Sequence, residues 1–222
     1  MIERLFPEYV SCAATREETV PDGILFPEEE ELVARSVPKR VNDFATARAC
    51  ARRAMAGLGL PPVPVLRGRR GAPLWPEGII GSLTHCEGYR AAALTRATDA
   101  LSLGIDAEPH APLPAGVGDL ISLPSERRWN FPPPPGDDGA LHWDRLLFSA
   151  KESVFKAWYP ITGTELDFDE ADITFHRAEH GGTEGTLSAR LLRTHPALPP
   201  TLRGRWRVED GIAATAVLVP HG

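Results

Sequence analysis

Two acidic residues lie near the end of the sequence LSLGIDAEP, in which apolar and polar residues alternate. Side chains two positions apart on a strand point to the same side, so Asp106 and Glu108 share one face. Two carboxylates this close repel each other unless a cation stabilises them, and carboxylate oxygens are preferred ligands of magnesium. The pattern therefore indicates a magnesium site, and an edge strand with a solvated acidic face is the alternative.

A third acid, Glu152, lies in the helical sequence LLFSAKESVFKAWY between Lys151 and Lys156. Glu152 and Lys156 are four residues apart, and such a pair on a solvated helix stabilises it by only about a few tenths of a kcal/mol. The functional alternative requires Glu152 to face Asp106 and Glu108, so that three carboxylates share one ion. Water and the phosphates of a substrate would complete the coordination of such an ion.

The charge distribution points to a phosphate-containing ligand. The chain of 222 residues has a net charge of −6, which argues against nucleic-acid binding as its main activity, yet residues 35–70 hold nine basic side chains and one acid. Arg40, Arg48 and Arg70 in this segment could form charge-assisted hydrogen bonds to phosphate oxygens. A solvated helix face followed by a charged loop is the alternative. Neither a GxGxxG sequence nor a P-loop sequence is present to explain phosphate binding.

The cysteines and the N-terminal sequence favour a cytoplasmic protein. Cys12, Cys50 and Cys86 are odd in number and far apart, so a disulfide framework and a structural zinc site are both unexpected. The first residues lack a basic region followed by an apolar run, and no apolar segment approaches the roughly 20 residues of a membrane span. We expect no association with membranes.

Two long helices are expected to carry the candidate residues. The first covers residues 43–57, with Asn42 or Asp43 as its N-cap, and glycines and prolines end it. The second covers residues 144–159, with an apolar stripe along one side and Pro160 as its end.

Strands are expected around both helices. Runs of strand-forming residues occur at 79–83, 89–95, 101–108, 202–209 and 212–219. Asp210 and Gly211 fit a tight hairpin turn between the last two runs. Residues 1–38 and the proline-rich segment 109–143 are expected to be irregular apart from one short helix each.

These elements predict two lobes with a boundary near residues 97–101. The N-terminal lobe, 1–98, would hold the basic residues, and the C-terminal lobe, 99–222, would hold the acids. Because the two clusters fall in different lobes, a ligand site in the cleft between them is expected.

Three sequences in order along the chain resemble one known family. GSLTHC at 81–86, GIDAEP at 104–109 and FSAKESVFKAW at 148–158 are similar to the phosphopantetheinyl transferases of the surfactin-synthetase-activating type, especially their actinobacterial branch. The resemblance extends from about Ala34 to the C-terminus. It implies an α+β fold of two similar lobes related by pseudo-twofold symmetry, each a helix packed on a small antiparallel sheet.

The resemblance also implies an activity of the holo-acyl-carrier-protein synthase type. Such an enzyme transfers the 4′-phosphopantetheine arm of coenzyme A to a serine of an apo acyl- or peptidyl-carrier protein and releases adenosine 3′,5′-bisphosphate. The carriers could serve fatty-acid, polyketide or nonribosomal-peptide synthesis. An enzyme of this type is expected to work as a monomer.

Matching positions give the acids and lysines their implied roles. Asp106, Glu108 and Glu152 resemble the family's Mg²⁺ ligands, and Lys151 and Lys156 its contacts to the diphosphate. Lys156 would neutralise charge as the P–O bond breaks. Glu152 is our candidate for the base that takes the proton of the serine, directly or through a water molecule.

The remaining matches concern the nucleotide end of coenzyme A. Arg40, Arg48, Arg70 and His85 resemble the positions around the nucleotide and its 3′-phosphate. Where the family often has GKP, this chain has RGAP at 70–73, which keeps the charge but changes the geometry of a phosphate contact.

Docking of a carrier protein, which is usually acidic around its serine, would use basic and apolar groups. Arg127, Arg128 and Trp129 in the proline-rich segment are candidates, and solvated loop residues are the alternative. Two other functions compete with transfer. One is a magnesium-dependent phosphohydrolase of nucleotide diphosphates, and the other is a non-catalytic module that binds coenzyme A or a carrier protein.

Overall fold

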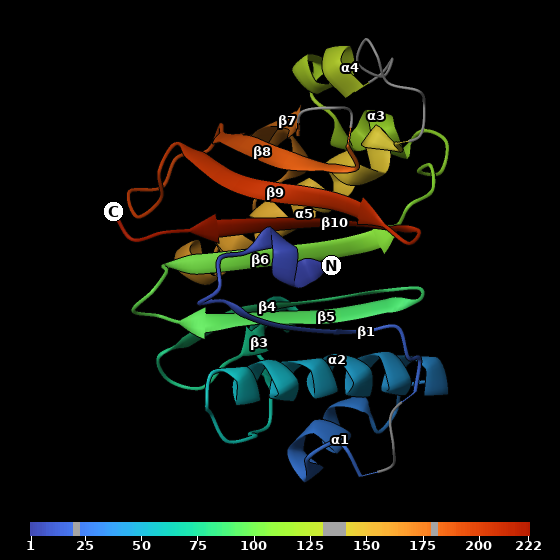
Figure 1. Cartoon of the computed structure of the whole chain (residues 1–222), viewed down its shortest axis with the longest axis vertical. Coiled ribbons are helices and arrows are strands. Elements are labelled where there is room, and N and C mark those ends of the chain that lie inside the picture. The colour runs from blue at the N-terminus through green and yellow to red at the C-terminus, as the bar shows by residue number, and fades with distance from the viewer. Residues whose placement is uncertain (20–22, 131–140, 179–181) are drawn as a thin grey trace.

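Antiparallel sheets and two long helices make up most of the chain (Figure 1). The computed structural model describes residues 1–19, 23–130, 141–178 and 182–222, without the side chains of 128–130. The helices are η1 (Ile2–Leu5), α1 (Pro27–Val33), α2 (Pro38–Gly57), η2 (Arg69–Gly71), α3 (Val117–Ile121), α4 (Pro124–Asn130), α5 (Trp143–Thr162) and η3 (Phe168–Glu170). The strands are β1 (Ser11–Thr15), β2 (Leu66–Arg67), β3 (Pro73–Leu74), β4 (Ile79–Cys86), β5 (Tyr89–Arg96), β6 (Ser102–Pro109), β7 (Ala171–Arg177), β8 (Glu184–Leu191), β9 (Thr201–Glu209) and β10 (Ile212–Val219).

The two larger sheets each carry one long helix. The smaller of them has the strand order β1-β5-β4 and the larger one the order β6-β10-β9-β8-β7, while β2 and β3 form a separate pair. Helix α2 packs on the smaller sheet and α5 on the larger one, and the smaller sheet lies between α2 and the larger sheet (Figure 1). Both helices have 20 residues. This arrangement confirms the α+β class.

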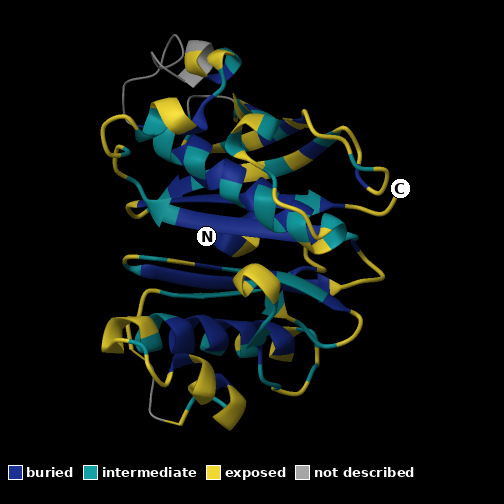
Figure 2. Cartoon of the chain, turned by 180° about the vertical axis from the view of Figure 1, so that it is seen from behind, coloured by how far each residue is buried: buried dark blue, intermediate teal, exposed yellow. Residues whose placement is uncertain are grey.

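Three apolar clusters hold these layers together. One lies between α2 and the smaller sheet and includes Met55, and a second lies between α5 and the larger sheet and includes Val154. The third joins the two sheets and η1 and includes Ile105. Seen from behind, the strands where the sheets meet and the inner sides of both helices are largely buried (Figure 2). The third cluster therefore fixes one sheet against the other.

Helix α2 begins before its predicted start. Pro38 occupies its first turn, where a residue without an N–H is well tolerated, and Val37 is the N-cap. The prediction that Asn42 or Asp43 caps this helix was therefore wrong, because Asp43 lies inside it and forms an ion pair with Arg90. The predicted end at Gly57 is confirmed.

Helix α5 continues past Pro160, which the sequence suggested as its end. Pro160 lies in the last turn, so it removes only one backbone N–H from the helix. The helix ends at Gly163, whose φ of +64° is left-handed and whose N–H bonds to the carbonyl oxygen of Tyr159.

The strands are more numerous than predicted, and β4 is longer. β4 extends to Cys86, so His85 lies on the strand and not after it. The hairpin of β9 and β10 around Asp210 and Gly211 is confirmed. β1, β2, β3, β7 and β8 were not predicted. No helix among residues 1–19, 23–130, 141–178 and 182–222 is long and apolar enough to cross a membrane.

Candidate active site

Two hydroxyl groups of β4 fix the strand that carries the acidic pair. β6 is the edge strand of the larger sheet, and β4 packs beside it. The Ser82 hydroxyl accepts a hydrogen bond from the backbone N–H of Ile105 (3.2 Å), and the Thr84 hydroxyl accepts one from the N–H of Ala107 (3.0 Å). These bonds satisfy backbone groups that an edge strand otherwise leaves unpaired. Asp106 is thereby held between two anchored residues.

Asp106 is buried and has one oxygen without a partner. The residue is only 5% exposed. Its Oδ1 accepts hydrogen bonds from Lys156 Nζ (2.7 Å) and from the Thr84 hydroxyl (3.3 Å). Its Oδ2 is buried and has no hydrogen-bond partner among the described residues. Because leaving such an oxygen unsatisfied is unfavourable, Oδ2 is suited to bind a cation.

Glu108 and Glu152 also keep oxygens free. Glu108 accepts a hydrogen bond from Arg145 through Oε2 (3.0 Å), and its Oε1 has no protein partner in the described part of the chain. Glu152 is half-buried, and neither of its oxygens has a hydrogen-bond partner there. Lys156 bonds to Asp106, so the surface pair of Glu152 with Lys156 does not form.

The electrostatics connect the three carboxylates. Burial is the main cause that raises the pKa of Glu108 and the pKa of Glu152, and the charge of Asp106 raises both further. The cations Arg145 and Lys156 oppose this rise in the pKa of Glu108, and Lys156 opposes it in the pKa of Glu152. The acids thus lie close enough to influence each other.

The donor set suits magnesium, although the side chains do not form a closed site as they stand. Among the described residues, no three His, Cys, Asp or Glu side chains are grouped closely enough to hold a metal ion. The unpartnered oxygens of Asp106, Glu108 and Glu152 are nevertheless hard carboxylate donors. An ion held by few protein ligands would leave positions for phosphate and water.

A cleft of about 680 Å³ lies along the basic segment and reaches Lys156, and none of Asp106, Glu108 and Glu152 lines it. Its walls come from α2, the loop around η2, β4 and the C-terminal half of α5. It is lined by five of the six residues predicted to bind the ligand, namely Arg40, Arg48, Arg70, His85 and Lys156. Because Lys156 lines the cleft and also bonds to Asp106, this lysine lies between the basic cleft and the carboxylates.

Arg48 is fixed in the wall of the cleft. It is 6% exposed, donates from Nε and Nη2 to the carbonyl oxygen of Val65 (3.2 Å each), and lies 3.6 Å from the centre of the Phe44 ring. Burial, with the charge of Arg67 second, lowers the pKa of Arg48 to about 10. A bound anion would relieve the repulsion between these two arginines.

His85 and Arg40 lie at the rim of the same cleft. Arg40 Nη1 is 3.3 Å from His85 Nε2. Loss of hydration, followed by the charge of Arg40, lowers the pKa of His85. A neutral imidazole can accept the hydrogen bond from Arg40 through Nε2.

Arg70 joins the two halves of the chain at the mouth of the cleft. Its backbone is left-handed, with φ +58°, and its side chain forms an ion pair with Glu165, which follows α5. Both side chains are exposed. A phosphate group bound by Arg70 would have to compete with Glu165.

Lys151 does not line this cleft, and its contact to a diphosphate stays a prediction. The residue is 3% exposed, and its Nζ lies 2.8 Å from a carboxylate oxygen of Glu126 on α4. It also donates to the carbonyl oxygens of Phe168 and Ala171. These contacts use the hydrogen-bonding capacity of the ammonium group and tie α5 to α4 and the start of β7.

Comparison with known proteins identifies the family of this chain. Residues 28–95 match the 4'-phosphopantetheinyl transferase N-terminal domain, and residues 102–208 match the 4'-phosphopantetheinyl transferase superfamily. The chain is 52% identical to the 4'-phosphopantetheinyl transferase Svp of Streptomyces mobaraensis, with 99% of this chain and 89% of that protein covered. The chain belongs to the 4'-phosphopantetheinyl transferase family.

Two further relatives support this membership. The transferase is 49% identical to the 4'-phosphopantetheinyl transferase Npt of Nocardia iowensis, over 98% of this chain and 99% of that protein. It is 51% identical to the 4'-phosphopantetheinyl transferase PptT of Mycobacterium tuberculosis, over 90% of this chain and 88% of that protein. All three relatives are named 4'-phosphopantetheinyl transferases. With the family match, these names support modification of carrier proteins by the transferase, and the actinobacterial resemblance is confirmed.

The docking candidates of the transferase belong to α4. Arg127 Nη1 lies 3.3 Å from a carboxylate oxygen of Asp119, and Arg127 Nε donates to the hydroxyl of Ser122 (3.0 Å). These contacts tie α4 to α3 and its C-terminal end. The side chains of Arg128 and Trp129 lie outside the described residues. Carrier docking at this segment stays a prediction.

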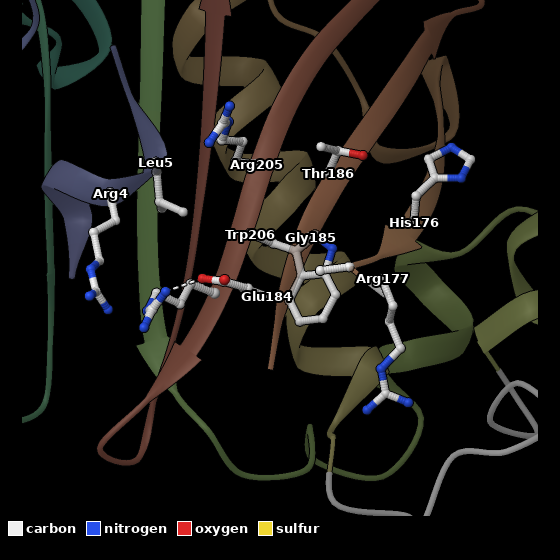
Figure 3. A pocket seen from close by; sticks show the side chains of 11 residues that line it. Arg4, Leu5, His176, Arg177, Glu184, Gly185, Thr186, Arg205 and Trp206 are labelled. Atoms are coloured by element: carbon white, nitrogen blue, oxygen red, sulfur yellow. Dashed lines mark hydrogen bonds and ion pairs between the residues drawn. The ribbon is translucent and has the colours of Figure 1, made fainter. Parts of the chain in front are cut away.

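A second cavity, of about 670 Å³, lies on the larger sheet beside η1 (Figure 3). Its basic lining residues are Arg4, His176, Arg177, Arg205 and Arg207. Arg207 forms ion pairs with Glu184 and Glu209. Figure 3 shows the side chains of Arg4, Arg177 and Arg205 pointing away from one another. Because this positive charge does not converge, the cavity is not the candidate site for a diphosphate.

Four residues that help to build the site were not singled out from the sequence. Ser82 and Thr84 are two positions apart and share one face of β4. Arg145 precedes Glu152 by two helical turns and therefore shares a side of α5 with it. This spacing in the sequence could have indicated that these residues belong to the site. Arg67 could have been found through its place in the basic segment.

Proposed function

We propose that the transferase moves the 4′-phosphopantetheine arm of coenzyme A to the serine of an apo acyl- or peptidyl-carrier protein, as a holo-acyl-carrier-protein synthase does. The observation that carries this proposal is the contact between Lys156 and Asp106 at 2.7 Å, because it joins the basic cleft to the acids. Coenzyme A would lie with its nucleotide phosphates at Arg40, Arg48, Arg70 and His85 and its diphosphate at Lys156.

The carboxylates would hold Mg²⁺ through the free oxygens of Asp106, Glu108 and Glu152. When bound there, the ion would neutralise negative charge on the diphosphate. Mg²⁺ use is part of the proposal, and its support is the buried Oδ2 of Asp106, which has no partner among the described residues.

Glu152 and Lys156 are the proposed catalytic residues. The serine oxygen forms a bond to the β-phosphorus, the bond to the leaving phosphate oxygen breaks, and adenosine 3′,5′-bisphosphate departs with the electron pair. Glu152 accepts the serine proton, which its raised pKa favours. Lys156 stabilises the charge that develops on the diphosphate oxygens.

The two sides of the cleft come from one chain, which supports a monomer as the active form and the proposed lobes 1–98 and 99–222. The three cysteines are free, which suits a reducing cytoplasm. We propose no nucleic-acid or membrane partner.

The test is the intact mass of apo carrier proteins after incubation with the full chain, coenzyme A and Mg²⁺. Carriers of fatty-acid, polyketide and nonribosomal-peptide synthesis form the panel, and a chelator is the control. We expect at least one carrier to gain one phosphopantetheine, and chelation to prevent the gain. Cleavage of coenzyme A with no change in any carrier would favour the phosphohydrolase, and unchanged coenzyme A and carriers would favour the non-catalytic module.

A further inference from the structure

Arg145 makes three contacts at the edge of the acidic site. Its Nη1 donates to Glu108 Oε2 (3.0 Å), its Nε donates to the carbonyl oxygen of Ala111 (3.0 Å), and its Nη2 donates to that of Pro112 (3.1 Å). The side chain of Arg145 is 16% exposed and that of Glu108 is 20% exposed. Arg145 is therefore held in place by the two carbonyl groups while it binds the carboxylate.

The contact leaves Glu108, like its neighbour Asp106, with one carboxylate oxygen bound by a cation and the other without a protein partner among the described residues. In each carboxylate one oxygen is bound by a cation from α5, which is Lys156 for Asp106 and Arg145 for Glu108. In each, the other oxygen has no protein partner among the described residues. Two cations on one helix thus orient two adjacent acids of one strand and leave one oxygen of each available.

We propose that Arg145 is a positioning residue that holds Glu108 with its Oε1 available to the metal ion. The inference rests on the proposed magnesium site and adds to it a residue that touches neither substrate nor metal. Partners that orient a metal ligand through a hydrogen bond usually contribute to metal affinity.

The geometry of the three contacts requires a guanidinium group. Arginine presents several N–H donors in a rigid plane, so it can bind a carboxylate and two carbonyl oxygens at once. A lysine side chain at this position keeps the charge, but its single nitrogen atom reaches fewer of these acceptors. Arg145→Lys should therefore retain part of the effect and Arg145→Gln should lose it.

The experiment measures binding of Mn²⁺ alone to the full chain by electron paramagnetic resonance, as a probe of the magnesium site. We expect Arg145→Gln to weaken Mn²⁺ binding about 10-fold, and Arg145→Lys to weaken it less. Arg190→Gln is the matched control, because Arg190 also donates to a carboxylate (Asp172, 2.7 Å) but lies on β8, away from the site. It should leave Mn²⁺ affinity unchanged.

A double-mutant cycle separates positioning from a general structural effect. Glu108→Gln keeps one carbonyl oxygen that can bind a metal but removes the charge that Arg145 holds. In this background, Arg145→Gln should change Mn²⁺ affinity by less than about two-fold, because coupled residues are non-additive. An equal loss in both backgrounds would show that Arg145 only supports the fold, and unchanged or tighter binding in the single variant would also overturn the proposal.

Failure of the magnesium site itself gives a different result. If the unmodified chain does not bind Mn²⁺, or if Asp106→Asn binds it equally well, the proposed metal site is wrong and the role of Arg145 is wrong with it. If the unmodified chain binds Mn²⁺ and Asp106→Asn does not, only the behaviour of the Arg145 variants decides the inference.

Discussion

Glu108 and Glu152 lie where burial and the charge of Asp106 disfavour their ionised forms. A group whose pKa is raised in the folded protein stabilises that protein below its ordinary pKa, here 4.5, and the stabilisation is lost as pH rises through the raised value. The free energy of unfolding of the metal-free transferase should therefore decrease as pH rises from 4.5 through the raised pKa values. A bound cation favours the ionised carboxylates and should restore it.

Glu108 and Glu152 also predict how the transfer rate changes at low pH. The proposed roles of Glu108 and Glu152 require their ionised forms, so the transfer rate should fall as decreasing pH protonates these carboxylates, whose pKa burial and the charge of Asp106 raise. More Mg²⁺ should move the midpoint of this fall to lower pH, because the ion competes with protons. The check is the pH dependence of the rate at two Mg²⁺ concentrations, and a midpoint insensitive to Mg²⁺ would contradict the shared site.

Lys151 and Lys156 flank Glu152 but should behave differently when replaced. Lys151→Met leaves the carboxylate of Glu126 buried without its cation, which should lower the free energy of unfolding by about 3–5 kcal/mol. Lys156→Met should weaken coenzyme A binding and stop transfer. Urea unfolding and calorimetric titration with coenzyme A measure the two effects. If both variants lose the same coenzyme A affinity at a temperature where both are folded, Lys151 contacts the ligand as Lys156 does, and the expected difference between the two lysines is wrong.

Glu165 should restrain ligand binding through its ion pair with Arg70. Glu165→Gln frees the guanidinium group for a phosphate, so the affinity for adenosine 3′,5′-bisphosphate should rise about two- to five-fold, as for the loss of an exposed ion pair. Arg70→Gln should lower it. Unchanged affinity in both variants would mean that Arg70 does not bind the ligand.

At the scale of elements, the close approach of β6 to α5 brings Asp106 within hydrogen-bond distance of Lys156. A Cβ atom at Gly104 would lie 2.0 Å from the carbonyl oxygen of Ser153 and 2.7 Å from the backbone nitrogen of Ala157. Only glycine lets the strand approach the helix this closely. The glycine that precedes the acidic pair thus has a packing role that charge patterns do not reveal.

Gly104→Ala should therefore push α5 away from β6. We expect a loss of about 1–3 kcal/mol in the free energy of unfolding and a fall in kcat of about 100-fold, since Lys156 and Asp106 would separate. Gly182→Ala is the matched control, because its Cβ would come no closer than 4.0 Å to a neighbouring heavy atom. A normal kcat in Gly104→Ala would contradict a site that depends on this contact.

The elements that the sequence predicted are those with a strong local pattern. Alternation along β6 placed Asp106 and Glu108 on one face, and helical spacing gave the buried stripe of α5. The end of α5 was predicted too early because proline is tolerated in the last turn when Gly163 supplies the cap. β7 was missed although Ala171, Ile173 and Phe175 alternate on its apolar face.

The candidate site was less accessible to sequence reasoning because its details depend on tertiary contacts. That Ser82 and Thr84 bond to β6 follows only once β4 is known to lie beside that strand. The sequence analysis gave Lys151 and Lys156 the same role, although five residues along a helix separate them by about 140°. The ion pair of Lys151 with Glu126 could not be foreseen, because it depends on how α4 packs against α5.

For the whole molecule, a basic cleft and an acidic site of opposite charge lie next to each other and meet at Lys156 and Asp106. The net charge of −6 conceals a basic wall from α2 and the η2 loop and an acidic site on β6 and α5. The apolar cluster between the sheets fixes these two groups relative to each other. A phosphorylated ligand that spans both groups is the simplest occupant of this arrangement.

The most direct test of the account is the intact mass of an apo carrier protein treated with coenzyme A and Mg²⁺ by the transferase and by its Asp106→Asn variant, with Arg190→Gln as control. The account predicts that the unmodified enzyme and Arg190→Gln add one phosphopantetheine to the carrier. Asp106→Asn, although folded, should add it at least about 100-fold more slowly, because the oxygen at the centre of the site has lost its charge. An equal rate of transfer by Asp106→Asn would contradict the central claim.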